Sequence, residues 1–309
     1  MIRRLAVLAL LVAFVAPSMA GEAVQPLPVV EVAPGVFVHE GVRAQATPEN
    51  EGAIANVGFI VGEKAVAVID SGGSPREGQE LLAAIRKVTA LPVAYVVNTH
   101  MHPDHILGNA VFAAEGATVV GHTHMPEALA AREAQYLEAN KRYLGPALSQ
   151  DLKFVAPILL VEGKLELDLG NRPILLQAWP TAHTDNDLTV FDEKTATLFA
   201  GDLVFQKHLP VIDGKILGWF KVMDELATVK AVRAVPGHGP ASIPWPDGMA
   251  DQRRYLETLA RDLREIIKRG GDLNEAVKTA GQSERDRWEL FDDYNPRNAT
   301  AGFAELEWE

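Results

Sequence analysis

The sequence predicts an α/β fold in which two groups of strands are combined with helices that lie between and after them. Short runs of β-branched and aromatic residues, bounded by glycine, proline and polar residues, are typical of strands. Stretches with apolar residues at helical spacing follow several of these runs, and polar residues gather where the runs end. The chain has 309 residues, 48% of them hydrophobic, which is enough for a sizeable core in one large domain or two ordinary ones.

The first twenty residues are predicted to be a secretory signal peptide and not part of the fold. Arg3 and Arg4 give a positive start, residues 5–16 are apolar, and Ala20 ends a small-x-small cleavage signal. An uncleaved membrane anchor is the alternative, but the apolar run is short for a span. We therefore expect an exported domain of residues 21–309.

Composition limits the kinds of partner and site. The formal net charge is -12, and removal of the two leading arginines would bring it to about -14. An acidic protein of this kind is not expected to bind nucleic acid or an anionic membrane surface. The chain has no cysteine, so it has no disulfide, and any metal must be bound by nitrogen and oxygen.

The first part of the chain predicts four short strands joined as antiparallel hairpins, over residues 29–32, 36–39, 53–61 and 65–69. Residues 41–52, a long polar link, are either a mobile flap over a site or an ordinary surface loop. His39, at a strand end, is expected to be structural. Asp70 either forms a simple turn or orients a metal-binding histidine. A helix is predicted over residues 75–88.

The sequence is most informative between Thr99 and His105, where three histidines and an aspartate fall within six residues. A buried strand is predicted just before them, over residues 92–97, and a helix just after, over residues 106–114, with Asp104 as its cap. Neutral imidazole and carboxylate are metal ligands, and strand ends are where α/β sheets place their sites. His100 and His102 can share a first metal, and Asp104 and His105 can bind a second. A histidine-rich surface loop is the alternative.

A second His-x-His pair, His122 and His124, follows a strand predicted over residues 117–120. No Asp-His follows this pair, and Pro126 starts a helix, so it is not expected to bind metal. The helix, residues 126–143, is interpreted as a covering helix, with one wall of a substrate cleft as the alternative.

A second sheet is predicted from residues 158–161, 164–167, 174–178, 187–192 and 197–200. Three further candidate ligands lie at strand ends: His183 in a loop, Asp202 after a buried strand, and His238 in a turn of glycines and prolines. Helices are predicted over residues 248–268 and 273–279 and are expected to cover the strands.

These motifs, in this order, resemble those of the metallo-β-lactamase superfamily of metallohydrolases. The order is His-x-His-x-Asp-His, a lone histidine, Gly-Asp and Pro-Gly-His-Gly, spread over essentially the mature chain. The resemblance implies a four-layer αβ/βα sandwich, with two mixed sheets face to face, helices outside and a metal site along one edge.

The resemblance also implies two Zn²⁺ ions, with iron or manganese as alternatives. The first ion would be held by His100, His102 and His183. The second would be held by Asp104, His105 and His238, and Asp202 would bridge the two. Such a pair of cations lowers the pKa of a shared water enough to supply hydroxide for attack on a carbonyl. The implied reaction is hydrolysis of an ester, thioester, lactone or β-lactam in a small-molecule substrate, with Asp104 able to accept a proton.

Two departures refine this resemblance. Asp202 stands where the best-known penicillin-destroying members have cysteine or serine, which is the arrangement of thioesterase-like and lactonase-like members. The sequence also shows no obvious counterpart of the extra C-terminal domain with which hydroxyacylglutathione hydrolases bind glutathione, so we do not expect one.

A narrower resemblance is to the quinoprotein relay system zinc metallohydrolases. It is carried by the predicted signal peptide, residues 53–62, the Asp70-Ser71-Gly72-Gly73 turn, and residues 201–205 with His208-Leu209-Pro210. It implies a periplasmic location and an association with quinoprotein alcohol oxidation. His208 would lie beside the site.

Two other functions fit the same ligands. One is an iron-dependent oxidoreductase like the persulfide dioxygenases, since histidine and aspartate also bind Fe(II). The complete second set of ligands favours two metals over one iron. The other is a non-catalytic partner or carrier in the quinoprotein system, which the intact motif disfavours.

Overall fold

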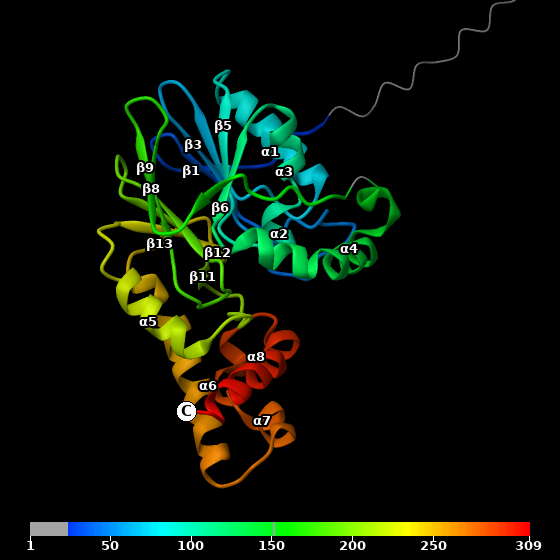
Figure 1. The fold of residues 1–309 in the computed structure, drawn as a ribbon, viewed down its shortest axis with the longest axis vertical. Helices are drawn as coiled ribbons and strands as arrows, with labels where there is room; N and C mark the ends of the chain where they lie inside the picture. The colour runs from blue at the N-terminus through cyan, green and yellow to red at the C-terminus, as the bar shows by residue number, and fades with distance from the viewer. Residues whose placement is uncertain (1–23, 151) are drawn as a thin grey trace, which may run out of the picture.

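A computed structural model describes residues 24–150 and 152–309, and the predicted signal peptide lies outside these residues. Two mixed β-sheets pack face to face with helices on the outside, which confirms the predicted α/β sandwich (Figure 1). Within the described residues, no helix combines the length and apolar character needed to cross a bilayer.

The first sheet has seven strands in chain order. They are β1 (Val30–Ala33), β2 (Val36–His39), β3 (Val57–Val61), β4 (Val66–Ile69), β5 (Val93–Val97), β6 (Thr118–His122) and β7 (Leu159–Val161). β1 to β4 pair antiparallel, as predicted, and β4 to β7 pair parallel. The assignment of residues 158–161 to the second sheet is wrong, because β7 pairs with β6.

The second sheet has six strands in the order β13-β12-β11-β10-β9-β8. They are β8 (Lys164–Asp168), β9 (Pro173–Ala178), β10 (Leu188–Asp192), β11 (Thr197–Phe205), β12 (Arg233–His238) and β13 (Ile243–Pro244). β11 continues well beyond the predicted residue 200 and is buried throughout. This sheet is antiparallel except for the β11–β12 pair.

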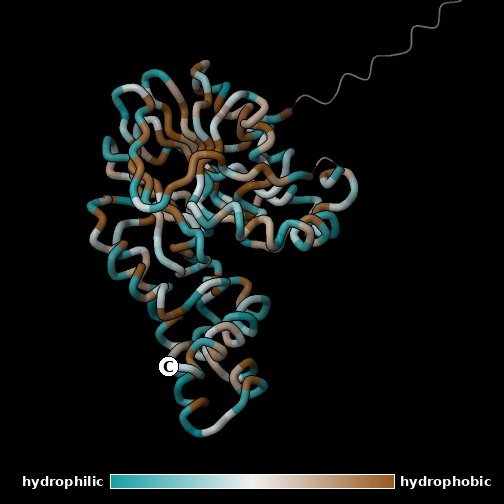
Figure 2. Tube along the Cα trace, viewed as in Figure 1, coloured by the Kyte–Doolittle hydropathy of each residue, from teal (hydrophilic) through white to brown (hydrophobic). Residues whose placement is uncertain are grey.

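Apolar side chains fill three layers. Between the sheets, Val38 and Ile60 of the first sheet pack with Leu176 and Val190 of the second. On the outer face of the first sheet lies α1 (Pro75–Val88). The second sheet is covered by α5 (Ile216–Leu226) and α6 (Ala250–Lys268). Figure 2 shows the resulting pattern, with hydrophobic strands inside and mainly hydrophilic helices outside.

The helix predicted over residues 106–114 is broken into α2 (Pro103–Ile106) and α3 (Asn109–Ala114). The break falls at Gly108, where a side chain would collide with the carbonyl oxygen of Ser71. Asp104 does not cap this helix as predicted; the cap position is His102, and it makes no capping hydrogen bond. The aspartate side chain is thereby left for the site described below.

The C-terminal helices do more than cover the sandwich. α6, α7 (Leu273–Thr279) and α8 (Phe291–Leu306) pack on one another and project below the sheets in Figure 1. α5 and α8 were not expected from the sequence. Across from α8 lies α4 (Met125–Ser149), which bends at Gly145 and runs beneath the first sheet.

Candidate metal centre

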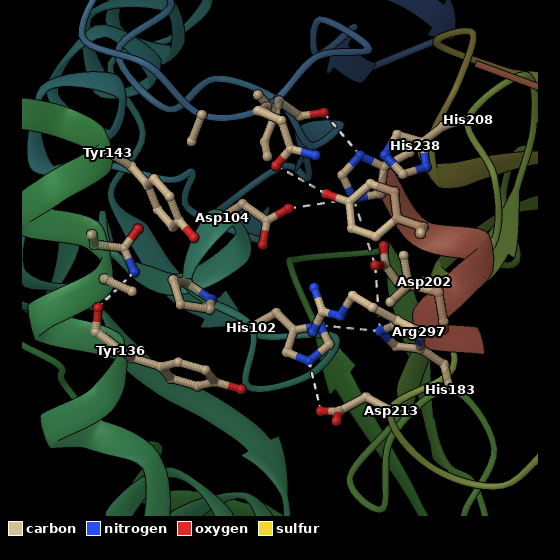
Figure 3. Close-up of a pocket in the computed structure, with 18 of the residues that line it drawn as sticks. His102, Asp104, Tyr136, Tyr143, His183, Asp202, His208, Asp213, His238 and Arg297 are labelled. Atoms are coloured by element: carbon tan, nitrogen blue, oxygen red, sulfur yellow. Dashed lines mark hydrogen bonds and ion pairs between the residues drawn. The ribbon is translucent and has the colours of Figure 1, made fainter. Parts of the chain in front are cut away.

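The seven predicted ligands converge at one edge of the sandwich, although they span residues 100–238 of the chain. Figure 3 shows those that line the cavity above them, which are His102, Asp104, His183, Asp202 and His238. They come from the loop after β5, the short helix α2, the loop between β9 and β10, the middle of β11 and the end of β12. Their ligand atoms form two groups, and within each group all atoms lie within 4.8 Å of one another. The first group is His100, His102, His183 and Asp202, and the second is Asp104, His105 and His238.

Asp202 lies between the two groups. Its Oδ2 is 3.7 Å from Nε2 of His100 and 3.4 Å from Nε2 of His183 in the first group. In the second group, the same oxygen is 3.5 Å from Nε2 of His238, and Oδ1 is 3.2 Å from Nε2 of His105. The position of Asp202 therefore matches that of a carboxylate shared by two ions. Gly237 makes room for it, because a side chain there would collide with Oδ1 of Asp202.

The buried polar atoms of this cluster fit a pair of metal ions. Nε2 of His100, Nε2 of His105 and Oδ1 of Asp202 are buried and have no hydrogen-bond partner among the described residues. Unpaired buried polar groups are costly, so native structures rarely keep them without an ion or water. Cations bound by both groups would satisfy all three atoms. The cluster thus fits a dinuclear metal site.

Each histidine of the cluster is held by one ring nitrogen, which leaves the other for a metal. For His105 the holder is Asp70, whose Oδ2 lies 2.8 Å from Nδ1. Backbone carbonyls do the same for His183 (Val211 O, 2.7 Å) and His238 (Ile54 O, 2.9 Å). Such partners fix the orientation and tautomer of a ligating imidazole. The contact of Asp70 with His105 is the one that the orienting role requires.

Asp70 also supports the other half of the motif through Thr99. The backbone N–H and the hydroxyl of Thr99 both donate to the Asp70 carboxylate, at 2.7 Å each, and the hydroxyl oxygen lies 3.1 Å from Nδ1 of His100. One buried carboxylate therefore orients a ligand in each metal group.

Asp213 contacts the cluster and lines the cavity, and it was not predicted from the sequence. Its Oδ2 lies 3.0 Å from Nε2 of His102, and Arg132 of α4 donates to the same oxygen. The other ring nitrogen of His102, Nδ1, is 3.1 Å from Nε2 of His183 and so faces the first group. No motif surrounds Asp213, so the sequence contained no signal for it.

Electrostatics separate the two groups of histidines in the metal-free protein. Burial lowers the pKa of His183 to about 4. Burial also acts to lower the pKa of His238, but the carboxylates of Asp202 and Asp104 outweigh it and raise that pKa to about 9. The pKa of His105 is raised in the same way, with Asp202 as the leading carboxylate. The second group must therefore lose protons when it binds a metal.

The remaining candidate histidines take no ligand position. His208 packs on the ring of His238, with centroids 4.7 Å apart, and its Nδ1 donates to the Leu209 carbonyl, so it lies beside the site as expected. His39 is tied to the Pro28 carbonyl, at 2.8 Å. His122 and His124 belong to neither group, and His122 accepts a hydrogen bond from the backbone N–H of His124.

A cavity of about 500 Å³ opens over the cluster. Gln45 and Ala46 line it, so the link over residues 41–52 borders the site. The long helix α4 forms one wall of the cavity, which is the alternative given for residues 126–143 and not the covering role. The opposite wall includes residues of α8. The wall residues of α4 are Arg132, Gln135, Tyr136, Ala139, Asn140 and Tyr143.

Fold and site together define an α/β sandwich protein with a His/Asp cluster at the sheet edge that fits a dinuclear metal site. The sequence model of the metallo-beta-lactamase superfamily matches residues 51–260, more than half of the chain, so this chain belongs to that superfamily.

Individual relatives are distant. A linear primary-alkylsulfatase of a Pseudomonas species is 26% identical over 155 residues, which are 49% of this chain and 28% of the sulfatase. The chain thus spans less than a third of that relative. Among solved structures, the sec-alkylsulfatase Pisa1 from Pseudomonas sp. has a TM-score of 0.69 at 18% identity, covering 89% of this chain and 49% of Pisa1. A metallo-beta-lactamase from Pontibacter korlensis has a TM-score of 0.61 at 19% identity, covering 75% of this chain and 99% of the lactamase. These two likenesses concern the fold.

Proposed function

We propose that this protein is a dinuclear zinc hydrolase that cleaves an ester, thioester, lactone or β-lactam bond in a small molecule. The observation that carries the proposal is the position of Asp202 between two complete groups of ligands at the floor of an accessible cavity. Because the cluster has two sets of possible ligands, it favours two metal ions over the single iron of a dioxygenase.

The ligands have distinct tasks in this reaction. Two cations bound here would supply Lewis-acid chemistry, lowering the pKa of water and polarising a carbonyl. Asp104 lines the cavity, and its side chain keeps 21% of its surface exposed, whereas that of Asp202 keeps 4%. Asp104 is therefore the carboxylate that can receive a proton from water on the substrate side. Asp202 keeps the two groups of ligands together.

Sulfate-ester hydrolysis is a second candidate. The curated relative is an alkylsulfatase, and its match covers 49% of this chain. The sulfur of a sulfate ester is an electrophile that the same pair of cations could activate. A sulfate ester therefore belongs in any substrate panel.

We further propose export to the periplasm and a link to a quinoprotein alcohol dehydrogenase system. Support comes from the N-terminal sequence and from the motifs that resemble the quinoprotein relay metallohydrolases. A non-catalytic role in that system predicts tight binding of the dehydrogenase or of quinone, and full function after Asp104→Asn. Cell fractionation and co-purification test the location and the partner.

A substrate panel tests the hydrolase proposal. Ester, thioester, lactone, β-lactam and sulfate-ester substrates are assayed with zinc-loaded wild type, His102→Ala and the control His124→Ala, whose histidine is outside the cluster. We expect activity on one class that falls by more than about 100-fold in His102→Ala, since even outer partners of ligands are worth roughly 10–100-fold. His124→Ala should keep it. Activity that survives His102→Ala or removal of zinc would contradict the proposal.

A further inference from the structure

We propose that the substrate of this site carries a singly charged oxyanion, such as a carboxylate or sulfonate, and that Arg297 of α8 binds that group at the cavity wall. The inference rests on the proposed function, because it names the class of substrate that the same cavity accepts. It makes α8 the element that selects the substrate.

α8 brings two side chains to the cavity. Tyr294 and Arg297 both line it, and they are three residues apart, so they lie on one face of the helix. Figure 3 shows Arg297 among the residues around the site. The helix begins at Phe291, after the last residue matched by the superfamily model, residue 260. This wall is therefore additional to the segment that defines the superfamily.

Arg297 differs from Arg132, the arginine of the opposite wall, in its partners. Arg132 forms an ion pair with Asp213. Arg297 lies 5.9 Å from the centroid of the Tyr294 ring, and within residues 24–150 and 152–309 it forms no ion pair with a carboxylate. A guanidinium without a carboxylate presents a planar fork of donors that matches a bound oxyanion.

No carboxylate of the cavity is free to neutralise Arg297. The aspartates in the lining are Asp104, Asp202 and Asp213. The first two face the ligand histidines, and Asp213 is engaged by His102 and Arg132. The protein as a whole is acidic, with a formal net charge of -12. A cationic group at the cavity would attract anions locally, in contrast to this overall charge.

The rest of the cavity is suited to an apolar or aromatic body. Tyr136 and Tyr143 lie on the α4 side, and Phe205 and Tyr294 on the other. A cavity of about 500 Å³ is large enough for one small molecule. A substrate with the scissile bond over the ligands, an apolar body between the tyrosines and an oxyanion at Arg297 would use every part of it.

Calorimetric binding of two probes of matched shape tests the proposal. Phenylbutanesulfonate carries an oxyanion that cannot be hydrolysed here, and phenylbutanol is its neutral counterpart. Zinc-loaded wild type should bind the sulfonate at least tenfold more tightly than the alcohol, and added salt should reduce this difference. Arg297→Gln should remove most of it. Arg261→Gln, which changes an exposed arginine of α6 paired with Asp262, should bind as wild type does.

Equal binding of the two probes by wild type would overturn the proposal, as would an unchanged preference in Arg297→Gln. Either result would leave the hydrolase proposal standing if the substrate panel is positive. Conversely, a preference for the sulfonate that depends on Arg297, in a protein that hydrolyses nothing in the panel, would refute the hydrolase and retain the oxyanion site.

Discussion

Each ligand histidine in this protein has two nitrogens with different tasks. One nitrogen is fixed by a partner, and the other faces the metal groups. The partners are Asp70, Asp213, the hydroxyl of Thr99 and two backbone carbonyls. The three side-chain partners can be tested by mutation without changing a ligand. Of these three, Asp213 is the best residue to mutate, because it lines the cavity and lies outside the histidine motif of residues 100–105.

Asp213→Ala should weaken zinc binding by roughly 10–100-fold, the usual effect of removing an outer partner of a ligating histidine. The physical reason is that Nε2 of His102 and the guanidinium of Arg132 both lose their acceptor. Competition with a chromophoric chelator measures the affinity. Asp224→Ala, at an exposed aspartate paired with Arg253, is the control and should bind as wild type does. Equal affinity of Asp213→Ala and wild type would remove Asp213 from the site.

At this scale the sequence predicted the members of the cluster better than the residues that contact them. His100, His102, Asp104 and His105 are adjacent in sequence, so their chemistry is visible as a motif. Asp213 is 111 residues from His102, and only the fold brings them together. Asp70 was recognised as one of two alternatives because it directly follows a predicted strand.

At the scale of elements, the start of α1 contains a buried carboxyl group, that of Glu77. Ser74 caps the helix, accepting from the backbone N–H of Glu77, and Oε2 of Glu77 accepts from the backbone N–H of Gly73 at 2.7 Å. Glu77 is buried, and its Oε1 has no hydrogen-bond partner among the described residues. Burial, with a smaller contribution from Asp104, raises the pKa of Glu77 to about 8.

This raised pKa makes the stability of the metal-free protein depend on pH. Between the ordinary pKa of about 4.5 and the folded value of about 8, the unfolded state has lost the Glu77 proton and the folded state retains it. The free energy of unfolding therefore falls as pH rises through this window. Glu77→Gln keeps an acceptor for Gly73 and cannot ionise. Urea unfolding in chelator should show wild type losing at least about 2 kcal/mol more than Glu77→Gln between pH 5 and pH 8. Parallel pH profiles would contradict this assignment.

Element boundaries show what a sequence pattern can and cannot supply. α1 and α7 agree with their predicted bounds, because Ser74 and Asp272 are recognisable caps. β7 has the expected residues but belongs to the other sheet, since a strand pattern does not name its partner. α8 was not expected, because polar side chains make up part of its buried face. Asn295 and Asn298 bond to the hydroxyl of Tyr255.

At the scale of the whole molecule, a buried ion pair connects the two sheets. Arg172, beside β9, pairs with Asp192 at the end of β10 at 2.7 Å. It also donates to the carbonyl of Pro34, in the turn between β1 and β2, at 3.0 Å and to the carbonyl of Val61, at the end of β3, at 2.8 Å. The Arg172 and Asp192 side chains keep 3% and 0% of their surface exposed. The Arg172 guanidinium therefore links the two sides of the sandwich, one from each sheet.

Arg172→Ala should lower the free energy of unfolding by about 3–5 kcal/mol, because it leaves the buried carboxylate of Asp192 uncompensated. Urea denaturation monitored by tryptophan fluorescence measures the change. Arg261→Ala removes an exposed arginine and should change stability by less than about 0.5 kcal/mol. A similar small change for Arg172→Ala would show that the pair does not hold the sheets together.

The proposed hydrolase requires two metal ions, held by groups of ligands that share Asp202. Native mass spectrometry after reconstitution with zinc and removal of excess metal measures this directly, with His105→Ala as a variant of the second group and His124→Ala as the control. We predict two zinc ions per chain in wild type and in His124→Ala, and one in His105→Ala. One ion or none in wild type, or two retained by His105→Ala, would contradict the central claim.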